Sequence, residues 1–215
     1  MKTCIFDLDG TLADTLESLT YSVRETLKEM KLREITEDQC RQFVGNGARY
    51  LIECSLKAAG DSGASRIEEG MEIYGRIFDA NCTYHVTPYE GMKEALLGLK
   101  EKGHKLAVLS NKPHRQTVKV VQEMFGETLF DCIQGQMESV KRKPDPEGVY
   151  KVMEMLHAEK EECLYIGDSE VDVETAQNAG VKCIGVTWGF RSREVLEDAG
   201  AVHIIDMPKD LLQYV

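Results

Sequence analysis

The chain has 215 residues, of which 42% are hydrophobic and 29% charged, the balance of a soluble globular protein that can bury a core of ordinary size. Its 37 acidic and 26 basic residues give a net charge of −11, which argues against a general nucleic-acid or anionic-membrane surface, because such surfaces need clustered lysine and arginine. A small phosphorylated ligand remains compatible with this charge if a metal ion or a few basic groups supply local positive charge.

The chain begins with a short apolar run, TCIF at 3–6, which predicts a buried strand. The segment 14–84 then breaks any strand pattern. It is rich in charged residues, and its apolar residues recur at helical spacing, as Leu16, Leu19 and Val23 do. We therefore expect an all-helical block of about 70 residues inserted after the first strand.

From residue 90 onward, apolar runs rich in β-branched residues alternate with helical patterns. This alternation predicts a parallel sheet with helices on both faces, and so an α/β, doubly wound, Rossmann-like fold. The expected strands are 105–110, 132–135, 163–167, 182–187 and 202–205, and the expected helices are roughly 90–102, 115–125, 146–156, 170–179 and 192–199.

Two domains are expected from this division. Residues 1–13 and 85–215 would form the catalytic α/β core, and residues 14–84 a helical cap domain. The hinges between them would lie at Ala13–Thr15 and at His85–Tyr89. The side chain at position 14 is an aspartate, which we expect to cap the first helix of the insertion rather than to bind a ligand.

Polar residues gather just after the predicted strands. In an open parallel sheet the carboxyl ends of the strands border the crevice in which ligands bind, so these distant segments should converge there. The residues concerned are Asp7 and Asp9, Ser110 and Asn111, Lys143 in KPDP, and Asp168 and Asp172 in GDSEVD.

The residue types in this group point to phosphate chemistry. Asp7 and Asp9 would share one side of an extended chain, where their carboxylates repel unless a cation or a shared proton relieves them. With Asp168 as a third acid and no clustered histidine or cysteine, the donors favour Mg²⁺ over zinc. Acids, magnesium and one lysine, Lys143, are the parts of a phosphoryl-transfer site, in which a carboxylate can itself be the nucleophile.

These segments resemble, in order, the four motifs of the haloacid dehalogenase superfamily. The resemblance extends over the whole chain, and the helical insertion between the first two motifs is similar to the α-helical cap of that family. It implies a magnesium-dependent phosphatase with a Rossmann-like core. The motifs are DLDGT at 7–11, SN at 110–111, Lys143 in KPDP, and GDSEVD at 167–172.

The resemblance also implies a role for each motif residue. Asp7 would be the nucleophile that forms an aspartyl phosphate, and Asp9 the general acid that then activates water. Mg²⁺ would be held by Asp7, by the backbone carbonyl of Asp9 and by Asp168, with Asp172 supporting the metal site from a second layer. The groups expected to bind the transferring phosphoryl group are Ser110, Asn111, Lys143 and the backbone N–H groups of Gly10 and Thr11.

Within the superfamily, two softer signals resemble the phosphoglycolate phosphatases: FVGNGARYLI at 43–52 and GVTWGF at 185–190. Phosphoglycolate is therefore the leading substrate. The alternatives are a pyrophosphatase and a sugar-phosphate phosphatase or phosphomutase of the same superfamily. We expect the loop Gly45, Asn46 and Gly47 to close over the site as a specificity loop, and Arg49 to pair with a substrate carboxylate.

A receiver-like signalling domain is the alternative from a different class, because receivers also combine clustered acids, Mg²⁺ and a lysine on a doubly wound sheet. The helical insertion has no role in such a domain. Lys112 either edges the pocket or lies in a solvated loop, and we assign it to the loop; Trp188 is assigned either to packing or to the wall of the site. The partner is expected to be a small phosphorylated metabolite, with neither nucleic acid nor membrane, and the chain to be a monomer or a homodimer.

The sequence also indicates a cytoplasmic protein. Its N-terminus, MKTCIFDLDG, lacks the long apolar region of a signal peptide, and no window approaches the ~20 apolar residues of a membrane span. Seven scattered cysteines without a C-x-x-C pair favour free thiols over a zinc site or disulfides.

Overall fold

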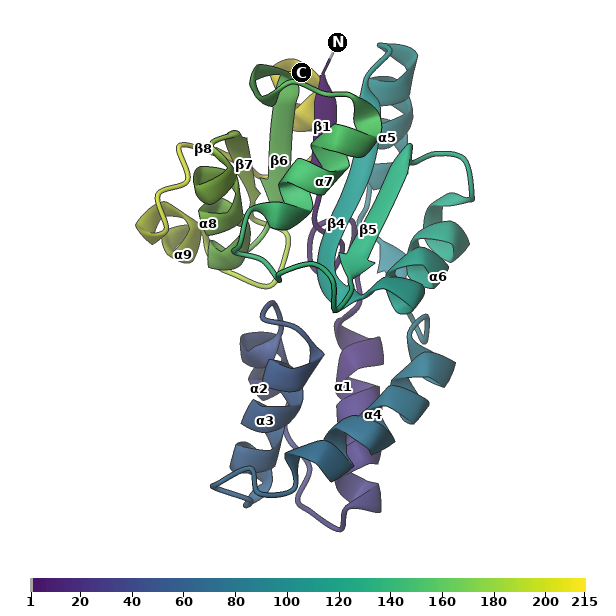
Figure 1. The fold of residues 1–215 in the computed structure, drawn as a ribbon, viewed down its shortest axis with the longest axis vertical. Helices are drawn as coiled ribbons and strands as arrows, with labels where there is room; N and C mark the ends of the chain where they lie inside the picture. The colour runs from purple at the N-terminus through teal and green to yellow at the C-terminus, as the bar shows by residue number, and fades with distance from the viewer. Residues whose placement is uncertain (1) are drawn as a thin grey trace.

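A computed structural model describes residues 2–215 and contains a six-stranded parallel sheet at its centre (Figure 1). The strands lie in the order β5-β4-β1-β6-β7-β8, which is the doubly wound Rossmann order and confirms the predicted fold class. The strands are β1 (Thr3–Phe6), β4 (Lys105–Pro113), β5 (Cys132–Gln136), β6 (Cys163–Gly167), β7 (Lys182–Val186) and β8 (His203–Ile205).

Helices cover both faces of this sheet, as the apolar strands require. Alternate residues of β1 enter separate apolar clusters: Cys4 and Phe6 join one, and Ile5 joins the other. The predicted helices after residue 90 are all present, with ends within about two residues of those expected. They are α5 (Met92–Glu101), α6 (His114–Phe125), α7 (Glu147–Leu156), α8 (Glu170–Ala179) and α9 (Arg193–Asp198), followed by α10 (Leu211–Tyr214).

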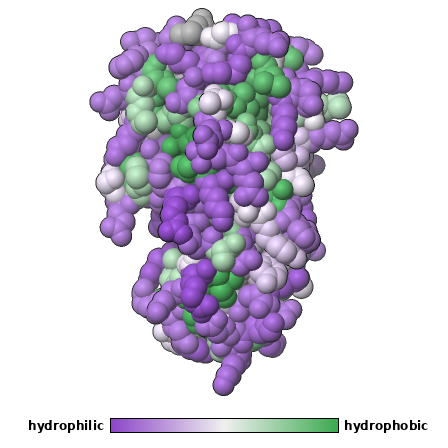
Figure 2. Space-filling view, turned by 90° about the vertical axis from the view of Figure 1, so that its right-hand side faces the viewer, coloured by the Kyte–Doolittle hydropathy of each residue, from purple (hydrophilic) through white to green (hydrophobic). Residues whose placement is uncertain are grey.

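Four helices between residues 16 and 81 lie beyond the carboxyl ends of the strands (Figure 1) and pack mainly on one another. Seen from the side, the molecule narrows between a larger and a smaller lobe (Figure 2). The buried face of α1 contains the helically spaced leucines and valine noted in the sequence. The helices are α1 (Leu16–Glu29), α2 (Glu37–Phe43), α3 (Ala48–Ala59) and α4 (Ile67–Asn81).

The two segments that connect these helices to the core form a small two-stranded sheet that the sequence pattern did not predict. Strand β2 (Ala13–Asp14) pairs antiparallel with β3 (Thr87–Pro88), at the positions expected for the hinges. The Asp14 carboxylate accepts the N–H of Leu16, the first residue of α1, at 3.1 Å, although Thr15 and not Asp14 occupies the N-cap position.

All seven cysteines are free thiols, in agreement with their scattered spacing. Over residues 2–215, the helices are too short or too polar for any of them to span a bilayer.

The packing of α5 on the sheet yields a matched pair of stability predictions. Leu96 is fully buried, whereas its neighbour Leu97 is 53% exposed. Leu96→Ala should lower the free energy of unfolding by about 2–5 kcal/mol because it leaves a cavity in the core. Leu97→Ala should change it by less than about 0.5 kcal/mol. Urea unfolding measures both, and equal effects would contradict the described packing of α5.

Candidate active site

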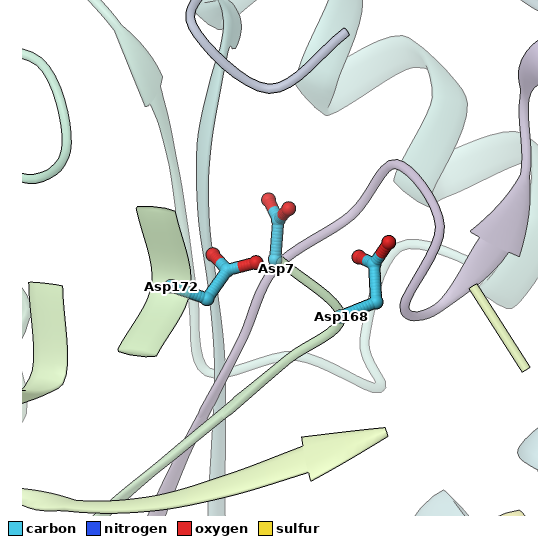
Figure 3. Close-up of side chains that lie close together, drawn as sticks. All are labelled: Asp7, Asp168 and Asp172. Carbon is cyan, nitrogen blue, oxygen red and sulfur yellow. The ribbon is translucent and has the colours of Figure 1, made fainter. Parts of the chain in front are cut away.

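Three buried carboxylates meet where β1 and β6 end. Asp7, Asp168 and Asp172 each offer an oxygen atom, and these atoms lie within 4.8 Å of one another (Figure 3). Asp7 follows β1 and Asp168 follows β6, and the two strands are neighbours with Phe6 opposite Ile166. This is the point at which the strand order reverses, the usual ligand crevice of a doubly wound sheet. The predicted convergence of these acids is therefore present.

Lys143 places the main positive charge in the cluster. Its Nζ lies 2.9 Å from Asp7 Oδ1 and 2.7 Å from Asp172 Oδ1, and it donates to the Tyr165 hydroxyl at 3.0 Å. The Lys143 side chain is only 3% exposed. Burial alone would lower the pKa of Lys143, but the Asp172 and Asp7 carboxylates hold it well above its ordinary value. The amine is therefore a buried cation.

One lysine does not neutralise three carboxylates. Burial, reinforced by Asp172, raises the pKa of Asp7 well above its ordinary value in spite of Lys143. Burial and Asp172 likewise raise the pKa of Asp168 to about 7, although the Phe190 N–H and the Thr11 hydroxyl oppose the shift. The cluster thus favours binding a further cation, and its all-oxygen donors fit a hard divalent ion such as Mg²⁺.

The Asp172 carboxylate is already fully engaged by the protein. One oxygen pairs with Lys143, and the other accepts the N–H and the hydroxyl of Ser169, at 3.1 and 2.6 Å. Asp172 thereby caps α8 and fixes Lys143 beside Asp7. This geometry suits a supporting role, as the resemblance implied, better than direct binding of a metal ion.

The Asp9 carboxylate lies apart from the cluster and has different partners. Its Oδ1 accepts the Thr15 hydroxyl at 2.6 Å and is also contacted by Lys112 Nζ. Asp7 and Asp9 both line a single cavity between the sheet and the helices α1–α4. Two acids with separate environments on one cavity are what a nucleophile and a proton donor require.

The cavity is small, with a volume of about 40 Å³, which is space for a few water molecules. Its helical wall is largely apolar, and its core wall carries the charged groups. Residues from the helical part are Leu19, Val44, Gly45, Gly47, Ala48, Leu51, Tyr74 and Phe78, and residues from the core include Asp7, Asp9, Ser110, Asn111, Lys112, Asp168 and Arg191.

The assignment of Lys112 to a solvated loop is wrong. Strand β4 runs on to Pro113, and this carries the Lys112 side chain inward until it is only 2% exposed. Its Nζ contacts Asp9 and lies 5.3 Å from the centre of the Phe78 ring. The sequence signal was present, since Lys112 directly follows Ser110 and Asn111, but a lone lysine gives no indication of burial.

The turn after β1 differs in detail from the expectation for phosphate binding. The N–H groups of Gly10 and Thr11 donate to the carbonyls of Ala13 and Leu8, at 3.0 and 3.3 Å, so neither is free for a phosphoryl oxygen. Within residues 2–215 the N–H groups of Leu8 and Asp9 have no hydrogen-bond partner, which makes them the available donors.

Gly10 is nevertheless required at its position. Its φ is +89°, and a Cβ there would lie 2.4 Å from an oxygen of Asp168. The Thr11 hydroxyl donates to the other oxygen of Asp168 at 2.8 Å. Both residues therefore place Asp168, and Gly189 also permits this placement, because a Cβ there would lie 2.3 Å from the Asp168 Cβ.

Ser110 and Asn111, at the second predicted motif, have different environments. The Ser110 side chain is buried, lines the cavity and keeps its hydroxyl proton available, since its Oγ only accepts the N–H of Lys112. The Asn111 amide is occupied: it accepts the Lys143 N–H at 2.9 Å and donates to the carbonyls of Lys143 and Gly45. Asn111 thus ties three segments together, and its side chain has no free donor for phosphate.

The predicted specificity loop is only partly at the cavity. Gly45 and Gly47 line it, whereas Asn46 and Arg49 lie on a separate, shallow groove beside Arg142. The Arg49 guanidinium is half exposed and pairs with Glu68 at 2.5 Å, so it does not face the acids. The indole N–H of Trp188 donates to the Thr11 carbonyl at 3.0 Å, and the Trp188 side chain packs at the edge of the core.

Comparison with known proteins agrees with this geometry. A family model described as haloacid dehalogenase-like hydrolase matches residues 4–186. A phosphoglycolate phosphatase of Aquifex aeolicus is 34% identical over 190 residues, covering 88% of this chain and 86% of the relative. One of Pseudomonas syringae pv. syringae is 34% identical over 212 residues, covering 97% of this chain and 78% of the relative.

A solved structure also resembles this chain over its full length. The crystal structure of a predicted phosphoglycolate phosphatase from Haemophilus somnus 129PT matches with a TM-score of 0.92 at 26% identity, covering 100% of this chain and 97% of that chain. The match spans both the sheet and the four helices beyond it, since it covers the full length. The chain therefore belongs to the haloacid dehalogenase-like hydrolase family.

Proposed function

We propose that this protein is a magnesium-dependent phosphatase that hydrolyses a small phosphorylated metabolite through an aspartyl phosphate on Asp7, with phosphoglycolate as the leading substrate. The observation that carries the proposal is the arrangement of Asp7 and Asp9 on one cavity with different partners, Asp7 beside Lys143 and two acids, Asp9 beside Lys112.

In the first half of the reaction an oxygen of Asp7 attacks the phosphorus of the substrate. The bond between phosphorus and the leaving oxygen breaks, and Asp9 donates a proton to that oxygen. Lys143, 2.9 Å from Asp7, and the buried Ser110 hydroxyl are placed to hold phosphoryl oxygens, together with the free N–H groups of Leu8 and Asp9.

In the second half Asp9 removes a proton from a water molecule, which attacks the phosphorus. The bond from phosphorus to Asp7 breaks, releasing inorganic phosphate and restoring both carboxyl groups. Mg²⁺ held by Asp7, Asp168 and the Asp9 carbonyl would neutralise the phosphoryl oxygens and keep Asp7 ionised despite its burial. We further propose that residues 14–84 act as a cap domain that opens for the substrate and excludes water when closed.

Both the cavity and the named relatives support the proposed substrate. The leaving group would extend from the phosphoryl site past Asp9 toward Phe78, and the cavity there admits only a small group. Lys112, buried and positively charged beside Asp9, is the cation placed to meet a carboxylate on that group. Arg49 is turned away toward Glu68, so we assign carboxylate recognition to Lys112 instead.

A substrate panel tests the proposed function. Phosphate release should require Mg²⁺, should be abolished by chelation and should be fastest with phosphoglycolate among phosphoglycolate, pyrophosphate and sugar phosphates. Asp7→Asn should lower kcat by about 10³-fold or more, the scale of losing a nucleophile. Asp38→Asn, an exposed carboxylate on α2, serves as the matched control.

Two outcomes would contradict the proposal. Comparable turnover by Asp7→Asn would remove Asp7 as nucleophile. Phosphoryl transfer to a second hydroxyl without release of inorganic phosphate would instead identify a phosphomutase.

A second prediction concerns Lys112. Lys112→Met should lower kcat/KM for phosphoglycolate by about 10- to 100-fold, the scale of one hydrogen bond to a charged group, and should have a smaller effect on p-nitrophenyl phosphate, whose leaving group carries no carboxylate. Lys119→Met, which removes an exposed lysine from α6, is the control. An equal loss on both substrates would mean that Lys112 acts only by positioning Asp9 and does not recognise the leaving group.

A further inference from the structure

Arg191 lies on the core side of the cavity, in the segment after β7, and reaches across to the helical part. Its guanidinium donates to the carbonyls of Arg41 and Val44, at 2.8 and 2.7 Å, and more weakly to Gln42 at 3.4 Å. On the core it is held by Glu170, whose carboxylate lies 3.1 Å from Nε. One side chain thus bridges the first turn of α8 and the C-terminal end of α2.

The chemistry of this contact suits an arginine. The last carbonyls of a helix have no partner within the helix and carry partial negative charge. A guanidinium presents several N–H groups in a fixed plane, so it can bind more than one of these carbonyls at once. The Arg191 side chain is only 12% exposed, so water competes weakly for these donors.

The two carbonyls that follow Val44 are also bound from the core. Asn111 Nδ2 donates to the Gly45 carbonyl at 2.9 Å, and Arg142 Nη1 donates to the Asn46 carbonyl at 3.2 Å. Three consecutive carbonyls of the loop therefore each have a core side chain as donor, and the three donors come from three different segments of the core. We name Val44–Asn46 with these donors the carbonyl clasp.

The glycines of this loop permit the close approach. Gly45 has φ +119° and Gly47 has φ +85°, values that other residues adopt only with strain. A Cβ on Gly47 would lie 3.1 Å from Arg142 Nη1, so a larger residue would also require the Arg142 side chain to shift by a few tenths of an ångström. The Gly-Asn-Gly sequence thus serves the contact between loop and core through its backbone.

The carbonyl clasp is linked directly to the proposed catalytic groups. Val44 and Gly45 form part of the cavity wall, and so does Arg191. Asn111, which binds the Gly45 carbonyl, also binds the backbone of Lys143, the lysine beside Asp7. The position of the loop and the position of Lys143 are therefore set by the same amide.

We propose that Arg191 is a positioning residue that holds the cap closed: its bonds to the end of α2 form when the cavity is shut over the substrate and break when it opens. Arg191 supplies three of the five hydrogen bonds that core side chains donate to the carbonyls of residues 41–46, and it does so from a mostly buried side chain. The proposal rests on the closing cap of the proposed function but not on the identity of the substrate.

Hydrogen exchange measured by mass spectrometry tests this directly on the full chain, with Mg²⁺ and inorganic phosphate as the probe. Arg191→Met should raise amide exchange in residues 41–47 by about tenfold or more, because it removes three hydrogen bonds and the loss of one charge-assisted bond alone is worth about tenfold, while exchange in β1 and β6 stays unchanged. Arg191→Lys should lie in between, because an ammonium reaches fewer carbonyls. Arg41→Met is the control, since it removes a partly exposed side chain but leaves the carbonyl that Arg191 binds.

Kinetics supply the second readout. With p-nitrophenyl phosphate, kcat/KM should fall about tenfold in Arg191→Met and less in Arg191→Lys, and Arg41→Met should match the parent. Unchanged exchange in residues 41–47 of Arg191→Met would overturn the proposal, as would faster exchange with unchanged kcat/KM. If Arg191→Met does not fold, the test rests on Arg191→Lys. The proposal would then be overturned if Arg191→Lys matched the parent protein in both exchange and kcat/KM. If phosphoglycolate proves not to be a substrate, the interpretation of the exchange experiment does not change, because that experiment does not use phosphoglycolate.

Discussion

Negative charge buried at the carboxyl edge of the sheet is the constraint on which the rest of the site depends. Asp7, Asp168 and Asp172 lie within 4.8 Å of one another in surroundings that disfavour ionised carboxyl groups. Lys143 and hydrogen bonds from the turn after β1 offset part of this cost. What remains raises the pKa of Asp7 and Asp168, and a bound cation would relieve it.

This balance explains why so many loops must meet at one place. Each strand that ends at the crevice positions a part of the site: Asp7, the proposed nucleophile, directly follows β1, a hydroxyl and an amide lie on β4, and a second acid directly follows β6. The connection before α7 adds the lysine. No one segment could bury its polar groups alone, because their hydrogen-bond partners come from other segments. The Asn111 amide and the Lys143 backbone, which bind each other, are an example.

Most of this could be predicted from the sequence, for reasons that differ between residues. The apolar runs determine strands because strands covered on both faces need continuous apolar residues, and the acids at their ends stand out against that background. The contact of Asp14 with the start of α1 could be predicted as well, because it involves residues that are close together in the sequence. Lys112 and Arg191 could not be placed in this way, because their burial depends on where β4 ends and where α2 lies in space.

The same distinction explains the corrections. Whether the N–H groups of Gly10 and Thr11 are free depends on how the turn closes, and they are used within it. Asn111 has the residue type of a phosphate ligand, but its amide is occupied by a neighbouring loop and by the carbonyl of Gly45. Hydrogen-bond partners of this kind are determined by tertiary structure, and a local sequence pattern carries no information about it.

The central claim is that Asp7 becomes covalently phosphorylated. Rapid acid quenching of the enzyme during turnover of ³²P-labelled phosphoglycolate, followed by peptide mapping, tests it most directly. The account predicts label on the peptide that contains Asp7, labile to hydroxylamine as an acyl phosphate is and absent from Asp7→Asn. Turnover without labelled enzyme, or label on a residue other than Asp7, would contradict it.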